Sequence, residues 1–171
     1  MSAPPYKGEG AHALWHVSDD AAIACFEPRD GRVWAIDTRH LPLYWFPREC
    51  PRATFWAVDE TTDDDLDRFL GGDRTRRVHV IEPAWLDPMR RAVLHVYRLP
   101  EATFEPEDRY WISQTAVEPL EHSTLSDLIG LHAGAEIELR IAPKLLELWE
   151  RVTASTLDFS GIRLRNATLA R

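Results

Sequence analysis

The stretch from Leu14 to Tyr44 constrains the fold more than any other part of the sequence. Two apolar segments, Leu14–Ser18 and Val33–Ile36, lie on either side of a turn at Asp30-Gly31. They predict strands over 13–17 and 32–36, with a short helix over 21–25 between them and another that ends near Tyr44. Two neighbouring strands with histidine, serine, tryptophan and tyrosine near one end suit a pocket for a flat, polar ring.

The rest of the chain predicts an α+β fold, because strands dominate the first two thirds without a regular βαβ alternation. Neither a GxGxxG nor a GxxxxGK[ST] phosphate-binding motif occurs. Further strands are expected over 53–58, 77–82, 92–99, 110–113, 116–120 and 137–141, with an edge strand at 162–165. Helices are expected from the Thr61–Asp65 start to Gly71-Gly72, over 126–133 and from Pro143 to about 154.

Length and composition predict one globular domain over 12–171 after a flexible tail at 1–11. The net charge is 20 − 28 = −8, which disfavours nucleic-acid binding, although arginine clusters at 74–77 and 89–91 keep it open. Two isolated cysteines predict neither a disulfide framework nor a metal site. Since no signal peptide and no apolar run of about 20 residues is visible, we expect a cytoplasmic, bacterial-type protein without a membrane segment.

The first strand offers the best candidates for a binding site. His16 and Ser18 are two residues apart, so their side chains share one face of a strand and can hydrogen-bond a ribose and an amide together. Trp34 and Tyr44 carry rings that can stack on a planar ligand. The alternatives are ordinary: a histidine satisfied by backbone, a serine that caps the next helix, and aromatic rings that pack in the core.

Carboxylates follow the strand at 92–99. An acid just past a strand end can stabilise a developing cation, and Glu105, Glu107 and Asp108 occupy such positions, although most acidic loops are simply solvated. His122 and His132 are too far apart for a familiar zinc spacing, so no metal is expected. Cys25 has no activating neighbour in the sequence, which argues against a nucleophilic cysteine.

Nearly the whole chain, from Leu14 to Ala167, resembles a bacterial family of about 170 residues whose function is unknown. The blocks that carry this resemblance are LWHVS, VWAID with PLYWFPR, and FSGIRLRNA, at 14–18, 33–48 and 159–167. This resemblance implies no activity.

A more distant likeness is to the ADP-ribosyltransferases, especially the small rifamycin enzymes. His16-Val17-Ser18 resembles their His-x-Thr/Ser strand, in which glycine usually takes the place of Val17. Trp34 stands where those enzymes carry an aromatic residue, often tyrosine, and Tyr44 resembles the second tyrosine of the polymerase branch. The order of a Val-Tyr strand, a Phe-acid loop and a Tyr-containing strand matches 96–113 and suggests Glu105, or else Asp108, as the catalytic acid.

The likeness implies an ADP-ribosyltransferase-like split antiparallel β-sheet with flanking helices and NAD⁺ as substrate. Three catalytic residues are implied: His16, Tyr44 and Glu105. The backbone of Val17 would hold nicotinamide, and His16, Ser18, Trp34 and Tyr44 would complete the NAD⁺ site. The acceptor would be a protein or a small molecule. Alternatives are a non-catalytic ligand- or protein-binding domain of the same fold, an NAD glycohydrolase and, third, a small hydrolase.

Overall fold

The computed structural model describes residues 13–169, and the predicted tail at 1–11 lies outside them. The chain divides into two compact units that interleave along the sequence. Within the described residues, unit 1 contains 13–48 and 92–127, and unit 2 contains 49–91 and 128–169. That residues 12–171 form a single domain stays a prediction from the sequence.

Unit 1 is built on a six-stranded sheet in which every neighbouring pair is antiparallel. The strand order is β6-β7-β2-β1-β5-β8, and the bounds are β1 Leu14–Ser18, β2 Val33–Asp37, β5 Leu94–Leu99, β6 Glu105–Glu107, β7 Tyr110–Ser113 and β8 Glu121–Leu125. Apolar side chains of the strands and of the segments between them form its core: Leu14, Phe26, Val33, Ala35, Tyr97, Leu99, Phe104 and Val117. A 3₁₀ turn, η1 (Leu41–Tyr44), follows β2 and carries Pro42 at its start.

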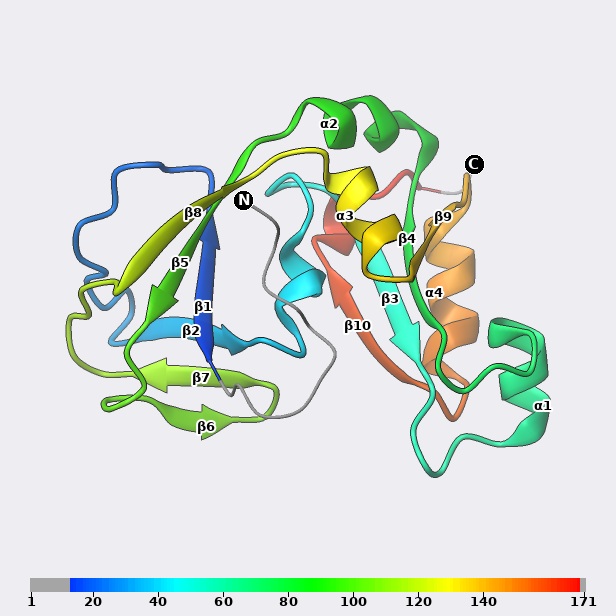
Figure 1. Cartoon of the computed structure of the whole chain (residues 1–171). Coiled ribbons are helices and arrows are strands. Elements are labelled where there is room, and N and C mark those ends of the chain that lie inside the picture. Colours follow the sequence, from blue (N-terminus) through cyan, green and yellow to red (C-terminus); the bar gives the residue numbers. More distant parts are fainter. Residues whose placement is uncertain (1–12, 170–171) are drawn as a thin grey trace. The chain divides into compact units, whose positions relative to one another are not determined.

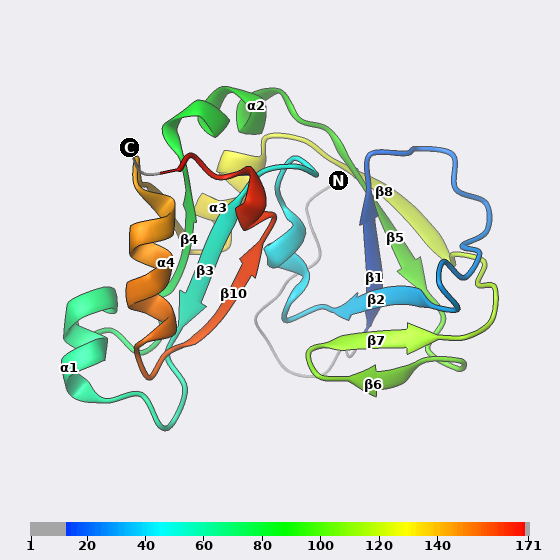
Figure 2. The same ribbon diagram turned by 180° about the vertical axis from the view of Figure 1, so that it is seen from behind.

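The sheet of unit 1 changes direction between β1 and β2. These strands pair at only two positions, Leu14 with Asp37 and Trp15 with Ile36, whereas β1 pairs with β5 along all five of its residues. Figures 1 and 2 show the result: β1, β5 and β8 lie side by side, and β2, β7 and β6 run across them. From His16 onward, β1 therefore has no ladder partner on its β2 side.

Unit 2 contains a four-stranded sheet in the order β10-β3-β4-β9. Its strands are β3 Arg52–Trp56, β4 Arg77–Ile81, β9 Ile137–Ile141 and β10 Asp158–Ile162, and only β4 and β9 are parallel. The helices are α1 Asp63–Asp65 with the π-helical turn η2 Leu66–Leu70, η3 Pro83–Trp85, α2 Leu86–Arg91, α3 Leu128–Gly134, α4 Leu145–Thr153 and η4 Leu164–Asn166. One face of the sheet presents Ala53, Phe55, Val78 and Val80 to the apolar face of α4.

The α+β class is confirmed, as are most elements with strong local signals. The Thr62 side chain caps the first helix of unit 2 by accepting a hydrogen bond from the backbone N–H of Asp65. Gly71 ends the adjoining turn at φ 62°. The expected edge strand at 162–165 instead occupies Asp158–Ile162 and is followed by η4. It does lie at an edge of its sheet.

Three local predictions are wrong. No helix forms over 21–25, because Asp20 Oδ1 accepts the N–H of Ala22 in a turn and Phe26 pairs with Val117. The expected strand at 116–120 is reduced to that bridge, and the strand forms at β8 instead. The supposed acidic loop at 105–107 is strand β6, whose edge position tolerates Pro106.

Candidate active site

A pocket of about 330 Å³ occupies the place where β1 and β2 separate. This volume lies within the range of small-ligand sites, about 300–1,000 Å³. Its walls come from both strands, from the end of η1 and from the start of β7: Trp15, His16, Val17, Trp34, Ala35, Ile36, Tyr44 and Tyr110. Successive residues of β1 point to opposite faces of a sheet. Because three in a row line the pocket, it opens at the edge of β1 that β2 leaves uncovered.

His16 is held by the neighbouring strand. Its Nδ1 lies 2.8 Å from the backbone oxygen of Trp34. A carbonyl can only accept, so Nδ1 carries the proton and Nε2 keeps a lone pair. Burial lowers the pKa of His16, the Trp34 carbonyl opposes this, and the positive charges of Arg48 and Arg29 lower the pKa further. The imidazole is therefore a neutral hydrogen-bond acceptor at pH 7.

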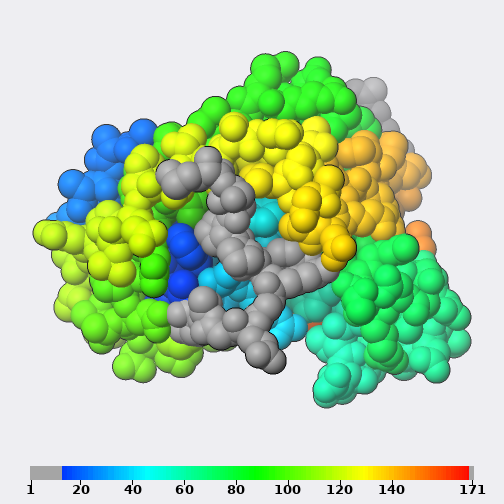
Figure 3. Space-filling view, in the orientation of Figure 1, coloured from blue at the N-terminus to red at the C-terminus, as the bar shows by residue number. Residues whose placement is uncertain are grey.

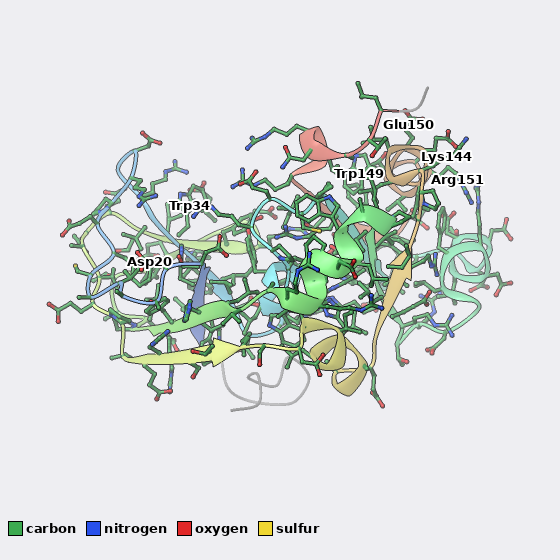
Figure 4. The ribbon with its side chains drawn as sticks, turned by 90° about the horizontal axis from the view of Figure 1, so that it is seen from above. Asp20, Trp34, Lys144, Trp149, Glu150 and Arg151 are labelled. Carbon is green, nitrogen blue, oxygen red and sulfur yellow. The ribbon has the colours of Figure 1, made fainter. Side chains whose placement is uncertain are left out.

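Aromatic side chains form the opposite wall. The rings of Trp34 and Tyr110 meet edge to face with centroids 5.7 Å apart, and the hydroxyl of Tyr44 donates to that of Tyr110 at 3.3 Å. Trp34, labelled in Figure 4, is 40% exposed and carries the guanidinium of Arg32 at 5.4 Å from its ring centroid. An exposed tryptophan beside two hydroxyl-bearing rings suits a planar ligand with polar edges.

The remaining predicted residues lie outside the pocket lining. Ser18 Oγ accepts the N–H of Asp20 at 3.1 Å, so it stabilises a turn and not the helix that the sequence offered as its alternative role. Glu105 is exposed on β6, and Asp108 occupies the next turn at φ 56° in an ion pair with Arg109. The structure thus gathers His16, Val17, Trp34 and Tyr44, and leaves Ser18 and both candidate acids aside.

The strand register nevertheless puts two carboxylates on the pocket face of the sheet. Trp34, Ile112 and Glu105 form one row across β2, β7 and β6, and Ile36, Tyr110 and Glu107 form the next. Cross-strand partners share a face. Glu107 is directly opposite a pocket residue, and its Oε1 lies 2.6 Å from Nη1 of Arg32.

Sequence reasoning missed Trp15 and Tyr110 as pocket residues. Tyr110 reaches the pocket only because β7 pairs with β2, and no short-range pattern signals a pairing between segments so far apart in the chain. Trp15 was hidden because the strand pattern placed it on the face opposite His16. Its indole N–H donates to Thr38 Oγ1 at 2.8 Å.

The described residues also bear on metal binding and on the reactivity of the Cys25 thiol. In the part of the chain that the structure describes, no three His, Cys, Asp or Glu residues are grouped so that they could hold a metal ion. Burial and the neighbouring Glu27 raise the pKa of the Cys25 thiol, which opposes a nucleophilic thiolate.

None of the described helices is long and apolar enough to span a bilayer.

The chain matches a family model over most of its length. The model of a family of unknown function (DUF6886) matches residues 15–167. No curated protein and no solved structure matches the chain.

Proposed function

Because the chain belongs to this family of unknown function, its activity has to be argued from the pocket, and we propose that the pocket binds the nicotinamide end of NAD⁺. The protein would then transfer ADP-ribose to an acceptor, which is a protein or a small molecule. One observation carries the proposal: a neutral imidazole with a lone pair on Nε2 and the rings of Trp34, Tyr44 and Tyr110 line the same cavity.

Each wall has a role in this proposal. His16 Nε2 accepts a hydrogen bond from a hydroxyl of the nicotinamide-side ribose, and the nicotinamide ring stacks against the aromatic wall. The carboxamide pairs with the backbone of β1 near Val17, where the strand has no β2 partner. The volume of about 330 Å³ suits one ring and its sugar but not the whole dinucleotide, so the adenosine half extends outside.

The reaction breaks the C–N bond between ribose and nicotinamide, and the bonding electrons leave with nicotinamide. Positive charge then develops on the ribose until a lone pair of the acceptor forms the new bond and the acceptor loses its proton. A carboxylate stabilises that charge. The family likeness points to Glu105 or Asp108, whereas the strand register favours Glu107, which faces Tyr110 and is oriented by Arg32. Water as acceptor would make the protein an NAD glycohydrolase.

A second candidate function is a non-catalytic ligand-binding domain. None of the described residues that line the pocket is acidic. A pocket without a carboxylate can bind a nicotinamide ring without cleaving its glycosidic bond.

We expect NAD⁺ to bind the full chain, and Trp34→Ala to weaken this binding about fivefold, since stacking contributes on the order of 1 kcal/mol. His16→Gln should weaken it by a similar factor, because the amide cannot reproduce both imidazole contacts. Calorimetric titration with NAD⁺ checks both. His122→Gln, on the same sheet but outside this pocket, is the matched control. Absence of NAD⁺ binding to the unmodified protein removes the proposal.

The rate of nicotinamide release distinguishes the three candidate carboxylates, Glu105, Glu107 and Asp108. Glu107→Gln should slow nicotinamide release about a hundredfold, the typical loss on removing one electrostatic stabiliser, while NAD⁺ affinity changes less than threefold. Glu105→Gln and Asp108→Asn should change the rate less than threefold. The measurement is nicotinamide released from NAD⁺, with and without cell lysate as a source of acceptors. The opposite ranking would assign the role to Glu105, and NAD⁺ binding without any release would leave the non-catalytic function.

A further inference from the structure

A second group of ring nitrogens lies at the other end of the unit 1 sheet, on β5 and the edge strand β8. His95 Nδ1 and His122 Nε2 are 3.0 Å apart. They occupy diagonal positions on one face, because His95 pairs with Thr124 and His122 pairs with Tyr97. His122 is exposed and His95 is half-buried, so both are accessible to solvent. The segment around β8, yellow-green in the space-filling view, lies at the surface (Figure 3).

We propose that His95 and His122 form a chelating site for a borderline divalent transition metal ion, such as Zn²⁺, Ni²⁺ or Cu²⁺. A metal–nitrogen bond is about 2.0–2.1 Å long, so two nitrogens that subtend about 90–109° at the metal lie about 2.8–3.4 Å apart. The observed separation of 3.0 Å falls in that range. One ring now donates its N–H to the facing nitrogen of the other. When the ion binds both facing nitrogens, that proton moves through solvent to the far nitrogen of the same ring, so each ring carries one N–H that points away from the metal.

The ring of His122 is also held in place before any metal binds. The ring of His122 stacks on that of Tyr97 with centroids 4.6 Å apart and planes 16° apart. Tyr97 is only 1% exposed, and its hydroxyl donates to the backbone oxygen of Asp20 at 2.6 Å. Preorganised ligands lose little conformational entropy on binding. This stacking distinguishes His122 from a freely rotating surface histidine.

The surroundings leave room for further ligands. A depression of about 410 Å³, bordered by Ala21–Ala24, Tyr97 and Pro119–His122, lies beside the ring of His122. The next pair in the β5–β8 ladder, Arg98 with Glu121 at 3.3 Å, consists of opposite charges that offset each other. With two protein ligands, the ion keeps open positions for water or a small anion. The affinity should follow the usual order for imidazole sites, with Cu²⁺ tightest.

Titration of the metal-free full chain with Cu²⁺, Ni²⁺ and Zn²⁺ at pH 7.5 tests the proposal. We expect one equivalent to bind, and His95→Gln and His122→Gln each to weaken binding at least tenfold, because either change destroys the chelate. Electron paramagnetic resonance of the Cu²⁺ form should show two coordinated nitrogens, and at most one in either variant. His40→Gln is the matched control, since His40 Nδ1 lies 2.8 Å from Asp37 Oδ1 and presents the rival pair.

The proposal fails if no metal binds in a one-to-one ratio, if either single variant retains the wild-type affinity, or if His40→Gln abolishes binding. Both histidines lie at the surface, so the variants should unfold at the wild-type temperature without metal. Thermal unfolding measured in parallel separates a lost ligand from a lost fold.

Discussion

Acidification from pH 6.5 to pH 4 is expected to lower the free energy of unfolding by about 3 kcal/mol through His132 alone. Burial lowers the pKa of His132 from 6.5 to about 4, the hydrogen bond to the Leu128 carbonyl opposes this, and the charge of Arg77 lowers the pKa further. Each pKa unit corresponds to about 1.4 kcal/mol of differential stability. The effect is large compared with a typical stability of about 5–15 kcal/mol.

The cause is a chain of hydrogen bonds in unit 2 that requires neutral rings. Arg77 Nε donates to His79 Nε2 at 3.1 Å, so the proton of His79 is on Nδ1, which lies 3.0 Å from His132 Nε2. His132 Nδ1 in turn donates to the oxygen of Leu128 at 2.6 Å. The pKa of His79 lies well below its usual value because the ring is buried and because it lies near Arg77, His132 and Arg52. A proton on either ring breaks the chain.

The direction follows from proton uptake. Between pH 6.5 and 4 the unfolded chain binds a proton at His132 that the folded chain does not, so unfolding becomes easier as the pH falls. Above pH 6.5 both states are neutral and this contribution to stability is fully present. Asp65, whose pKa is lowered mainly by hydrogen bonds from Thr156, acts only below its usual value of 3.8 and so outside this window.

Urea unfolding at several pH values between 7.5 and 4.2 measures the free energy, and NMR titration of the histidine rings assigns the cause. We expect a flat profile above pH 6.5, a steady decline below it, and a His132 midpoint near 4. A His132 midpoint near 6.5 would refute the explanation even if stability fell.

Gly161→Ala is expected to destabilise the protein by about 1–3 kcal/mol, the usual cost of overpacking a tight site. A Cβ at Gly161 would lie 2.6 Å from Leu164 Cδ1 and 2.7 and 2.8 Å from two carbons of the Trp149 ring. Trp149, labelled in Figure 4, belongs to α4 and also meets Phe159 edge to face at 5.3 Å. Leu164 can rotate away, but a ring wedged between strand and helix cannot.

Two further variants make this prediction specific. Gly134→Ala is the control, because nothing lies within 4 Å of a Cβ at that position, and it should be neutral or slightly stabilising. In a Trp149→Leu background, Gly161→Ala should cost at least about 1 kcal/mol less, since contacting residues are energetically coupled. Thermal and urea unfolding measure each of these proteins. Equal costs in both backgrounds would contradict the proposed clash.

The success of the sequence predictions depended on how local the controlling interaction is. The helix after Thr62 and its end at Gly71 follow from side-chain capping and left-handed backbone within a few residues. The apolar strands β3, β4 and β9 carry their own signal. The 21–25 helix failed because turn and bridge contacts override a weak helical preference, and β6 was missed because its pairing with β7 compensates for a poor strand sequence.

The candidate site divides in the same way. Residue type and sequence neighbourhood were enough to name His16, Trp34 and Tyr44, which lie on the first two strands and the turn after them. Tyr110 could not, and neither could the place of Glu107 opposite it, because both depend on the register of β2, β7 and β6. The nitrogens of His95 and His122 were likewise separate in the sequence and are adjacent only through the β5–β8 pairing.

The sequence by itself determined the α+β class, most of the strands and the residues that can do chemistry, because periodicity, capping and side-chain type act over a few residues. Only the tertiary structure decided that β1 and β2 separate after two pairs to open a pocket, and which rings and carboxylates face it. Strand pairing joins residues far apart in the chain, and a shift of one residue in register would turn each of those side chains to the other face.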